Sequence, residues 1–162
     1  MLAHGEGMRP AFPPSPLMAA ALDEARAAAA RGEVPVGAVI ADDAGRIIAA
    51  AGNRTLELND PTAHAEMLAV RAATERIGNA RLNGCDIYVT LEPCAMCAGA
   101  ISIARLRRLV YAASDPKGGG VEHGARVFTH PTCHHRPELL PGIGESEAAA
   151  LLRDFFAVRR GV

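Results

Sequence analysis

The order of helix and strand patterns along the chain is the feature that most limits how it can fold. Ser15 followed by Pro16 is a helix start signal and Gly32 is a stop signal, so the first helix is expected over residues 16–31. Apolar runs at 36–40 and 46–51 flank a turn, Asp42-Asp43-Ala44-Gly45, and predict a hairpin. The other segments are predicted as a helix over 61–77 opened by Asp60-Pro61, a strand over 86–91, a helix over 93–104, a strand over 109–113, a Gly-rich loop over 115–124, a short strand or helix within 127–140, and a helix capped by Ser146 that ends near residue 160.

Helices that alternate with strands in this order favour an α/β protein, namely a three-layer α/β/α sandwich around a mixed central sheet. A chain of 162 residues fits one domain. We expect this domain to span residues 15–162 and to follow a disordered leader, residues 1–14, which is rich in Gly and Pro without periodicity. Met1 and Met8 are both compatible with the true start.

Composition excludes some functions. The formal net charge is −1, so no overall positive field attracts nucleic acid, and such a partner would depend on a local basic patch. No apolar run approaches the roughly 20 residues of a membrane span. Four cysteines, two of them in a C-x-x-C, indicate metal or redox chemistry rather than a disulfide framework, and we infer a reducing, cytoplasmic environment.

Three side chains of the kind that binds zinc occur as His64 and the pair Cys94-x-x-Cys97. Cysteines at i and i+3 project from one helix face, and the start of a helix favours thiolate over thiol. Structural zinc sites usually have four protein ligands, whereas catalytic sites have three and a water molecule. Three ligands therefore predict a catalytic zinc whose open position activates water.

Glu66 lies two residues after His64. On a helix these positions are about 200° apart, so the two side chains would not bind one ion from the same face. Near the first turn, both could still border a cavity at the helix end. A carboxylate there is placed to take a proton from the activated water and pass it on, which predicts a general acid/base role.

Simpler interpretations remain open. The C-x-x-C could be a redox pair, and Cys85 could complete a structural four-ligand site, although a small apolar side chain at a strand start is the simpler role for Cys85. His130, Cys133, His134 and His135 could form a second metal cluster or simply a polar loop. A non-catalytic binding module stabilised by zinc is a third alternative, but it gives no reason for Glu66.

The motifs His64-Ala65-Glu66 and Pro93-Cys94-Ala95-Met96-Cys97 resemble the H-x-E and P-C-x-x-C signature of the zinc nucleobase deaminases. Within that superfamily, which includes the cytidine and deoxycytidylate deaminases, the chain is similar to the bacterial tRNA-specific adenosine deaminases from about residue 17 to residue 160. The stretches that carry this further likeness include Glu33-Val34-Pro35-Val36-Gly37-Ala38-Val39, Gly52-Asn53-Arg54, Asp115-Pro116-Lys117, and Phe155-Phe156 followed by Arg159-Arg160.

The resemblance implies conversion of adenosine to inosine at the wobble position of an arginine tRNA, by a homodimer with one zinc ion in each subunit. It implies that His64, Cys94 and Cys97 hold zinc, that Glu66 shuttles protons, and that a splayed-out adenine enters the pocket. It further implies contacts from Asn53 to the base or ribose, and from Asp115, Lys117 and Arg160 to the anticodon stem-loop. The segment 121–126 and His134 depart from the family pattern.

A second enzyme remains open, a deaminase of a free base or nucleoside such as guanine or cytosine, because those relatives share the metal motif. For the last helix, packing in the core is a simpler role for Phe155 and Phe156 than base stacking. Arg105, Arg107 and Arg108 could be no more than a solvated helix end.

Overall fold

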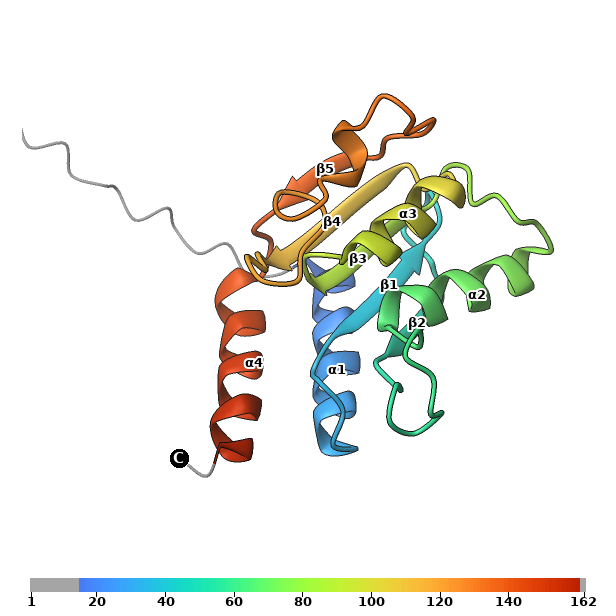
Figure 1. Cartoon of the computed structure of the whole chain (residues 1–162). Helices are drawn as coiled ribbons and strands as arrows, with labels where there is room; N and C mark the ends of the chain where they lie inside the picture. Colours follow the sequence, from blue (N-terminus) through green and yellow to red (C-terminus); the bar gives the residue numbers. More distant parts are fainter. Residues whose placement is uncertain (1–14, 161–162) are drawn as a thin grey trace, which may run out of the picture.

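A five-stranded sheet lies between two pairs of helices in the computed structural model, which describes residues 15–160 (Figure 1). The predicted leader, residues 1–14, lies outside the described residues. The elements follow in the order α1 (Pro16–Ala30), β1 (Gly37–Ala41), β2 (Ile47–Gly52), α2 (Ala65–Ile77), β3 (Asp86–Leu91), α3 (Ala95–Ile103), β4 (Arg108–Ala113), the 3-10 helix η1 (Val127–Thr129), β5 (Glu138–Pro141) and α4 (Glu145–Arg159). The predicted three-layer α/β/α sandwich is confirmed.

The sheet is mixed, with strand order β2-β1-β3-β4-β5. The predicted hairpin pairs β1 with β2, and β1 also pairs antiparallel with β3. From β3 onward the strands are parallel, because α3 returns the chain from β3 to β4 and the segment containing η1 leads it to β5. The ends of β3 and β4 are thereby adjacent, and both continue into loops beside α3.

Each face of the sheet has its own apolar core. On one face, α1 and α4 contact each other and cover Val39, Val110 and Ala112 (Figure 1). Helix α1 approaches very closely, since a Cβ atom at Gly37 would lie 1.9 Å from the carbonyl oxygen of Ala21. On the other face, α2 and α3 pack side by side against residues of β1, β3 and β4.

Helix α2 buries a stripe of alanines, Ala65, Ala69 and Ala73, at a spacing of four residues. These small side chains let the helix lie close to the sheet, whose larger side chains, such as Ile40 and Ile87, supply the bulk of this core. The start of α2 is therefore held at a fixed depth against the sheet.

Three predicted helix starts are wrong. Asp60-Pro61 does not open α2, because the Asp60 carboxylate instead accepts bonds from the amide and hydroxyl of Thr62, which forms a local turn, and α2 begins at Ala65. Helix α3 begins at Ala95 instead of Pro93, and α4 begins after Gly144 without a cap from Ser146.

The remaining local predictions have mixed outcomes. The segment within 127–140 contains both a short helix, η1, and a strand, β5. Phe155 packs in the core as expected, but Phe156 is 39 % exposed, so core packing does not hold for it. Arg107 and Arg108 are not a solvated helix end, since both lie within 4.0 Å of Asp86. Across residues 15–160, none of the helices has the length and apolar character needed to cross a membrane.

Candidate active site

Three ligand atoms of the predicted metal site converge beneath the starts of α2 and α3. His64 Nδ1 lies 3.6 Å from Cys94 Sγ and 3.5 Å from Cys97 Sγ, and all three ligand atoms lie within 4.8 Å of one another. Tetrahedral zinc with Zn–N near 2.05 Å and Zn–S near 2.3 Å would separate nitrogen from sulfur by about 3.6 Å. The donors and their spacing therefore fit one zinc ion, with Nδ1 as the imidazole ligand.

The backbone explains how two helices can offer ligands to one ion. His64 and Cys94 are the N-cap residues of α2 and α3, and both have extended backbone conformations. Their side chains therefore leave from outside the helices, while Cys97 lies in the first turn of α3. Neither N-cap side chain makes a capping hydrogen bond at the start of its helix, so both remain directed at the metal site.

Asn53, which is 12 residues away in sequence, caps the start of α2. Its side-chain oxygen accepts the backbone N–H of Ala65 at 2.8 Å, so a residue that follows β2 caps the helix in place of His64. Asn53 is half-buried beside this helix start. The structure thus places Asn53 next to His64, as a residue of the site would require.

The two sulfurs differ in their affinity for a proton. The hydrogen bond from the Cys97 thiol lowers the pKa of Cys94 to about 4, with a further contribution from His64 and against the effect of burial. The same bond, together with burial, raises the pKa of Cys97, which keeps the shared proton. The bond to Cys94 also raises the pKa of His64. Before metal binds, the site therefore already carries a thiolate, the form that zinc requires.

Glu66 belongs to the first turn of α2 and is 4 % exposed. Burial raises the pKa of Glu66, and its interactions with the backbone, Cys97 and His64 offset that effect only in part. A carboxylate with a raised pKa near zinc ligands suits proton transfer at neutral pH. Because His64 lies outside the helix, the angle of about 200° expected between the two residues does not apply, and both face the ligand cluster.

The other predicted substrate-contacting residues lie on two separate parts of the chain. Asp115 is half-buried and Lys117 is exposed, both on the loop that follows β4. Arg160 is exposed at the end of α4, on the opposite face of the sheet from α2 and α3, so it does not line the metal site of its own chain. Its neighbour Arg159 donates to the carbonyl of Gly32 and lies over the ring of Phe155.

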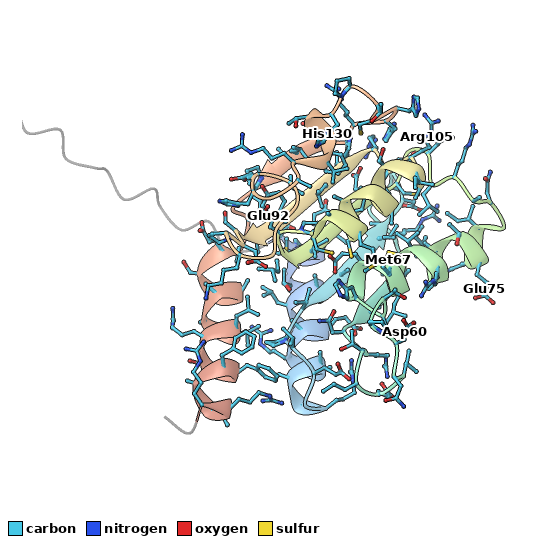
Figure 2. The ribbon with its side chains drawn as sticks, viewed as in Figure 1. Asp60, Met67, Glu75, Glu92, Arg105 and His130 are labelled. Atoms are coloured by element: carbon cyan, nitrogen blue, oxygen red, sulfur yellow. The ribbon has the colours of Figure 1, made fainter. Side chains whose placement is uncertain are left out.

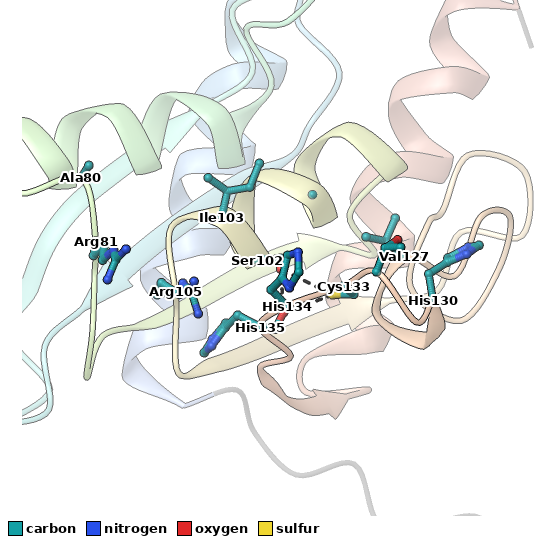
Figure 3. A pocket seen from close by; sticks show the side chains of 12 residues that line it. Ala80, Arg81, Ser102, Ile103, Arg105, Val127, His130, Cys133, His134 and His135 are labelled. Atoms are coloured by element: carbon teal, nitrogen blue, oxygen red, sulfur yellow. Dashed lines mark hydrogen bonds between the residues drawn. The ribbon is translucent and has the colours of Figure 1, made fainter.

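A separate hollow of about 610 Å³ lies beside the C-terminal end of α3 (Figure 3). It is lined in part by His130, Cys133, His134 and His135, the cluster considered as a second metal site. His130 and His135 each donate a ring N–H to a backbone carbonyl, which occupies one nitrogen of each ring. Within residues 15–160, the metal-ligand geometry is found at His64, Cys94 and Cys97 alone. Cys85 is buried just before β3 and is not part of it.

Sequence reasoning missed two buried glutamates near the site, Glu33 and Glu92, which are each 2 % exposed. Both accept backbone N–H bonds from loops that flank the metal site. The sequence does carry one signal for Glu92: it is a charged residue at the end of a β-rich segment, directly before Pro93. Its partners are 23 to 31 residues away, too far for any local pattern to reveal them.

The fold and the site together define a zinc hydrolase, because three protein ligands converge beside a buried carboxylate. The "cytidine and deoxycytidylate deaminase zinc-binding region" family matches residues 14–113. The tRNA-specific adenosine deaminase of Agrobacterium fabrum is 60% identical over 143 residues, which cover 88% of this chain and 93% of that protein. The tRNA-specific adenosine deaminase of Rickettsia bellii is 48% identical over 86% of this chain and 97% of its own length.

Solved structures of similar proteins agree with this family assignment. A structure from studies of A-to-I editing by tRNA:A34 deaminases at the wobble position of transfer RNA superposes with a TM-score of 0.82, at 60% identity over 84% of this chain and 98% of that one. The guanine deaminase from Nitrosomonas europaea has a TM-score of 0.76, at 26% identity over 89% of this chain and 86% of its own. The chain belongs to the cytidine and deoxycytidylate deaminase family, and it is an enzyme whose cofactor is zinc.

Proposed function

We propose that this enzyme hydrolyses the 6-amino group of adenosine at the wobble position of a tRNA anticodon, and that the natural substrate is an arginine tRNA. Water and adenosine give inosine and ammonia. One observation carries the choice of substrate, namely 60% identity over 88% of the chain to a relative called tRNA-specific adenosine deaminase. The site geometry supports the reaction type, because a buried carboxylate lies beside a three-ligand zinc set.

In this proposal His64, Cys94 and Cys97 bind the metal, which when bound supplies a Lewis acid that activates water at neutral pH. Glu66 accepts the proton released by that water, because burial raises the pKa of its carboxyl and makes it a stronger base than an exposed glutamate. Glu66 then gives this proton to N1 of the adenine as the water oxygen bonds to C6. It next takes the remaining proton of that hydroxyl group and gives it to the amine, so that the C6–N bond breaks and ammonia leaves. The burial of Glu66 keeps these transfers out of bulk water.

Substrate contacts are proposed for the residues around the pocket. The oxygen of Asn53 is committed to the N–H of Ala65, which leaves its two amide N–H groups for a base or ribose oxygen. Asp115 and Lys117 would contact nucleotides beside the target, and Arg160 would contact the stem-loop. Since the net charge is −1, such local contacts would have to supply the affinity for RNA.

A cytoplasmic homodimer is part of the same proposal. Met96 and Ile103 are 37 % and 80 % exposed, and they are seven residues apart on α3, so they share its outward face. Two exposed apolar side chains on one helix face support an interface with a second copy. Sedimentation of the zinc-loaded protein should give the mass of two chains.

The test is to incubate the zinc-loaded enzyme with total bacterial tRNA and then sequence the tRNA, since inosine is read as guanosine. The proposal expects conversion at the first anticodon position of an arginine tRNA. Conversion of a different tRNA would correct the natural substrate alone. Conversion of free guanine or cytosine, with no change in tRNA, would overturn the proposal in favour of a free-base deaminase.

Glu66→Gln tests the assigned role. This nearly isosteric variant should keep its zinc and lose about 10²–10⁴-fold in turnover, the usual contribution of a general acid/base. Glu75→Gln is the matched control, because Glu75 is an exposed residue near the other end of α2 (Figure 2), and it should react like the unmodified enzyme. Unchanged turnover in Glu66→Gln would refute the proton-transfer role.

A further inference from the structure

Glu92 is a buried carboxylate that the proposed reaction does not use. It follows β3 and precedes Pro93, and Figure 2 marks it beside the loop that follows β4. Its side chain is 0% exposed. A carboxylate that is removed from water requires hydrogen-bond donors around it.

All the partners of Glu92 come from one segment, residues 115–123, which we call the 115–123 loop. Glu92 Oε1 accepts the backbone N–H of Asp115 at 3.1 Å and the ring Nδ1–H of His123 at 2.8 Å. Glu92 Oε2 accepts the backbone N–H groups of Val121, Glu122 and His123 at 3.1–3.2 Å. Both ends of the loop are therefore tied to a single carboxylate.

The loop also packs directly on the turn that carries the first cysteine ligand. A Cβ atom at Gly119 would lie 2.2 Å from Glu92 Oε2, and one at Gly120 would lie 2.5 Å from the backbone nitrogen of Ala95. The N–H of Gly120 donates to the carbonyl of Pro93 at 2.8 Å. The same loop presents Lys117 at its exposed tip.

We propose that Glu92 is a positioning residue for substrate recognition, because its carboxylate fixes the 115–123 loop against the start of α3. In this role Glu92 touches neither substrate nor metal. It holds Asp115 and Lys117 in place beside the turn that carries Cys94. The link to RNA binding rests on the proposed function above, whereas the ordering of the loop does not.

Glu92→Gln isolates this role, because a Gln amide offers one acceptor oxygen and one NH2 donor. In one orientation the NH2 group faces the three amides of Val121, Glu122 and His123; in the other it faces the N–H of Asp115. Either orientation sets donor against donor, so at least one hydrogen bond is lost and the others lose their charge assistance. The open form of the loop should become at least about tenfold more populated.

The chain offers a direct readout of loop opening, since Lys117 is its single lysine. A lysine-specific protease therefore cuts the native protein at one bond, between Lys117 and Gly118, at a rate that follows the open population. Glu92→Gln should raise that rate at least about tenfold. Glu33→Gln is the matched control, because Glu33 is equally buried but binds residues 55–57, and it should leave the rate unchanged.

Steady-state kinetics on an anticodon stem-loop separate positioning from general damage. Glu92→Gln should retain one zinc ion per chain and should raise KM by a larger factor than it lowers kcat. Cleavage at the wild-type rate, or a loss of zinc that accounts for the loss of activity, would overturn the proposal. If Glu92→Gln does not accumulate as folded protein, His123→Ala is the milder variant, because it removes only the ring N–H bond to Glu92 Oε1. Cleavage should then rise by a smaller factor, and no rise would refute the role.

Failure of the proposed function would look different. In that case the wild-type enzyme leaves tRNA unmodified, yet Glu92→Gln still accelerates cleavage at Lys117.

Discussion

Asn53 is expected to have two separable roles, and substitution can distinguish them. The structural role is the bond from its side-chain oxygen to the N–H of Ala65, a residue that is 0% exposed at the start of α2. Asn53→Ala removes the cap and leaves a buried N–H without an acceptor. A lost cap costs about 1 kcal/mol and an unsatisfied buried donor about 1–3 kcal/mol. Because both figures describe the same lost hydrogen bond, they do not add, and the free energy of unfolding should fall by about 2 kcal/mol.

For a domain of this size each kcal/mol corresponds to about 2–4 °C, so the Tm of zinc-loaded Asn53→Ala should fall by about 4–8 °C. Asn53→Asp keeps the acceptor and adds a negative charge at a helix N-terminus, which is favourable, so its Tm should lie close to that of the wild type. The substrate role requires the amide N–H donors, which both variants lack. Both should therefore show a raised KM for the anticodon stem-loop.

The assay is calorimetric melting in parallel with steady-state deamination, on protein of equal zinc content. Equal destabilisation of Asn53→Ala and Asn53→Asp would refute the capping argument. A wild-type KM in Asn53→Asp would refute the donor contact with substrate.

The remaining predictions concern close packing and thiol chemistry. Gly120→Ala places a Cβ atom 2.5 Å from the first backbone nitrogen of α3, so overpacking should cost about 1–3 kcal/mol in chemical denaturation, whereas Gly118→Ala meets only the end of a flexible carboxylate at 3.0 Å and should cost less. Equal effects would contradict the close approach of the loop. In metal-free protein the pKa of Cys94 is about 4, so the thiol is mainly deprotonated from about one pH unit above that value, and its alkylation should stay nearly constant from about pH 8 to about pH 5.5. Cys85, whose pKa is raised by burial, should react far more slowly, and an alkylation rate at Cys94 that falls tenfold per pH unit would refute the assignment.

Much of the fold could be predicted because its signals are local. Ser15 caps α1 as expected, and the apolar runs on either side of Asp42–Gly45 pair as β1 and β2. The errors arise where two local signals compete. Asp60 can cap a helix or close a turn, and the hydroxyl of Thr62 favours the turn, which moves the start of α2 to Ala65.

The site residues likewise include some that the sequence predicts and some that it does not. Zinc imposes a residue type and a spacing, so the ligand candidates His64, Cys94 and Cys97 could be found without coordinates. The bonds of Glu92 and the cap from Asn53 could not, because each joins segments that only the folded sheet brings together. Strand β5 was similarly obscure, since its four residues are all exposed at the sheet edge and show no alternating pattern.

The central claim is that zinc is held by two sulfurs and one imidazole, with a fourth position left for water. X-ray absorption spectroscopy at the zinc edge of the purified enzyme tests it directly. The account predicts two sulfur neighbours near 2.3 Å and two nitrogen or oxygen neighbours near 2.0 Å. A third sulfur, as a closed site with Cys85 would give, or an active enzyme that contains no zinc, would contradict it.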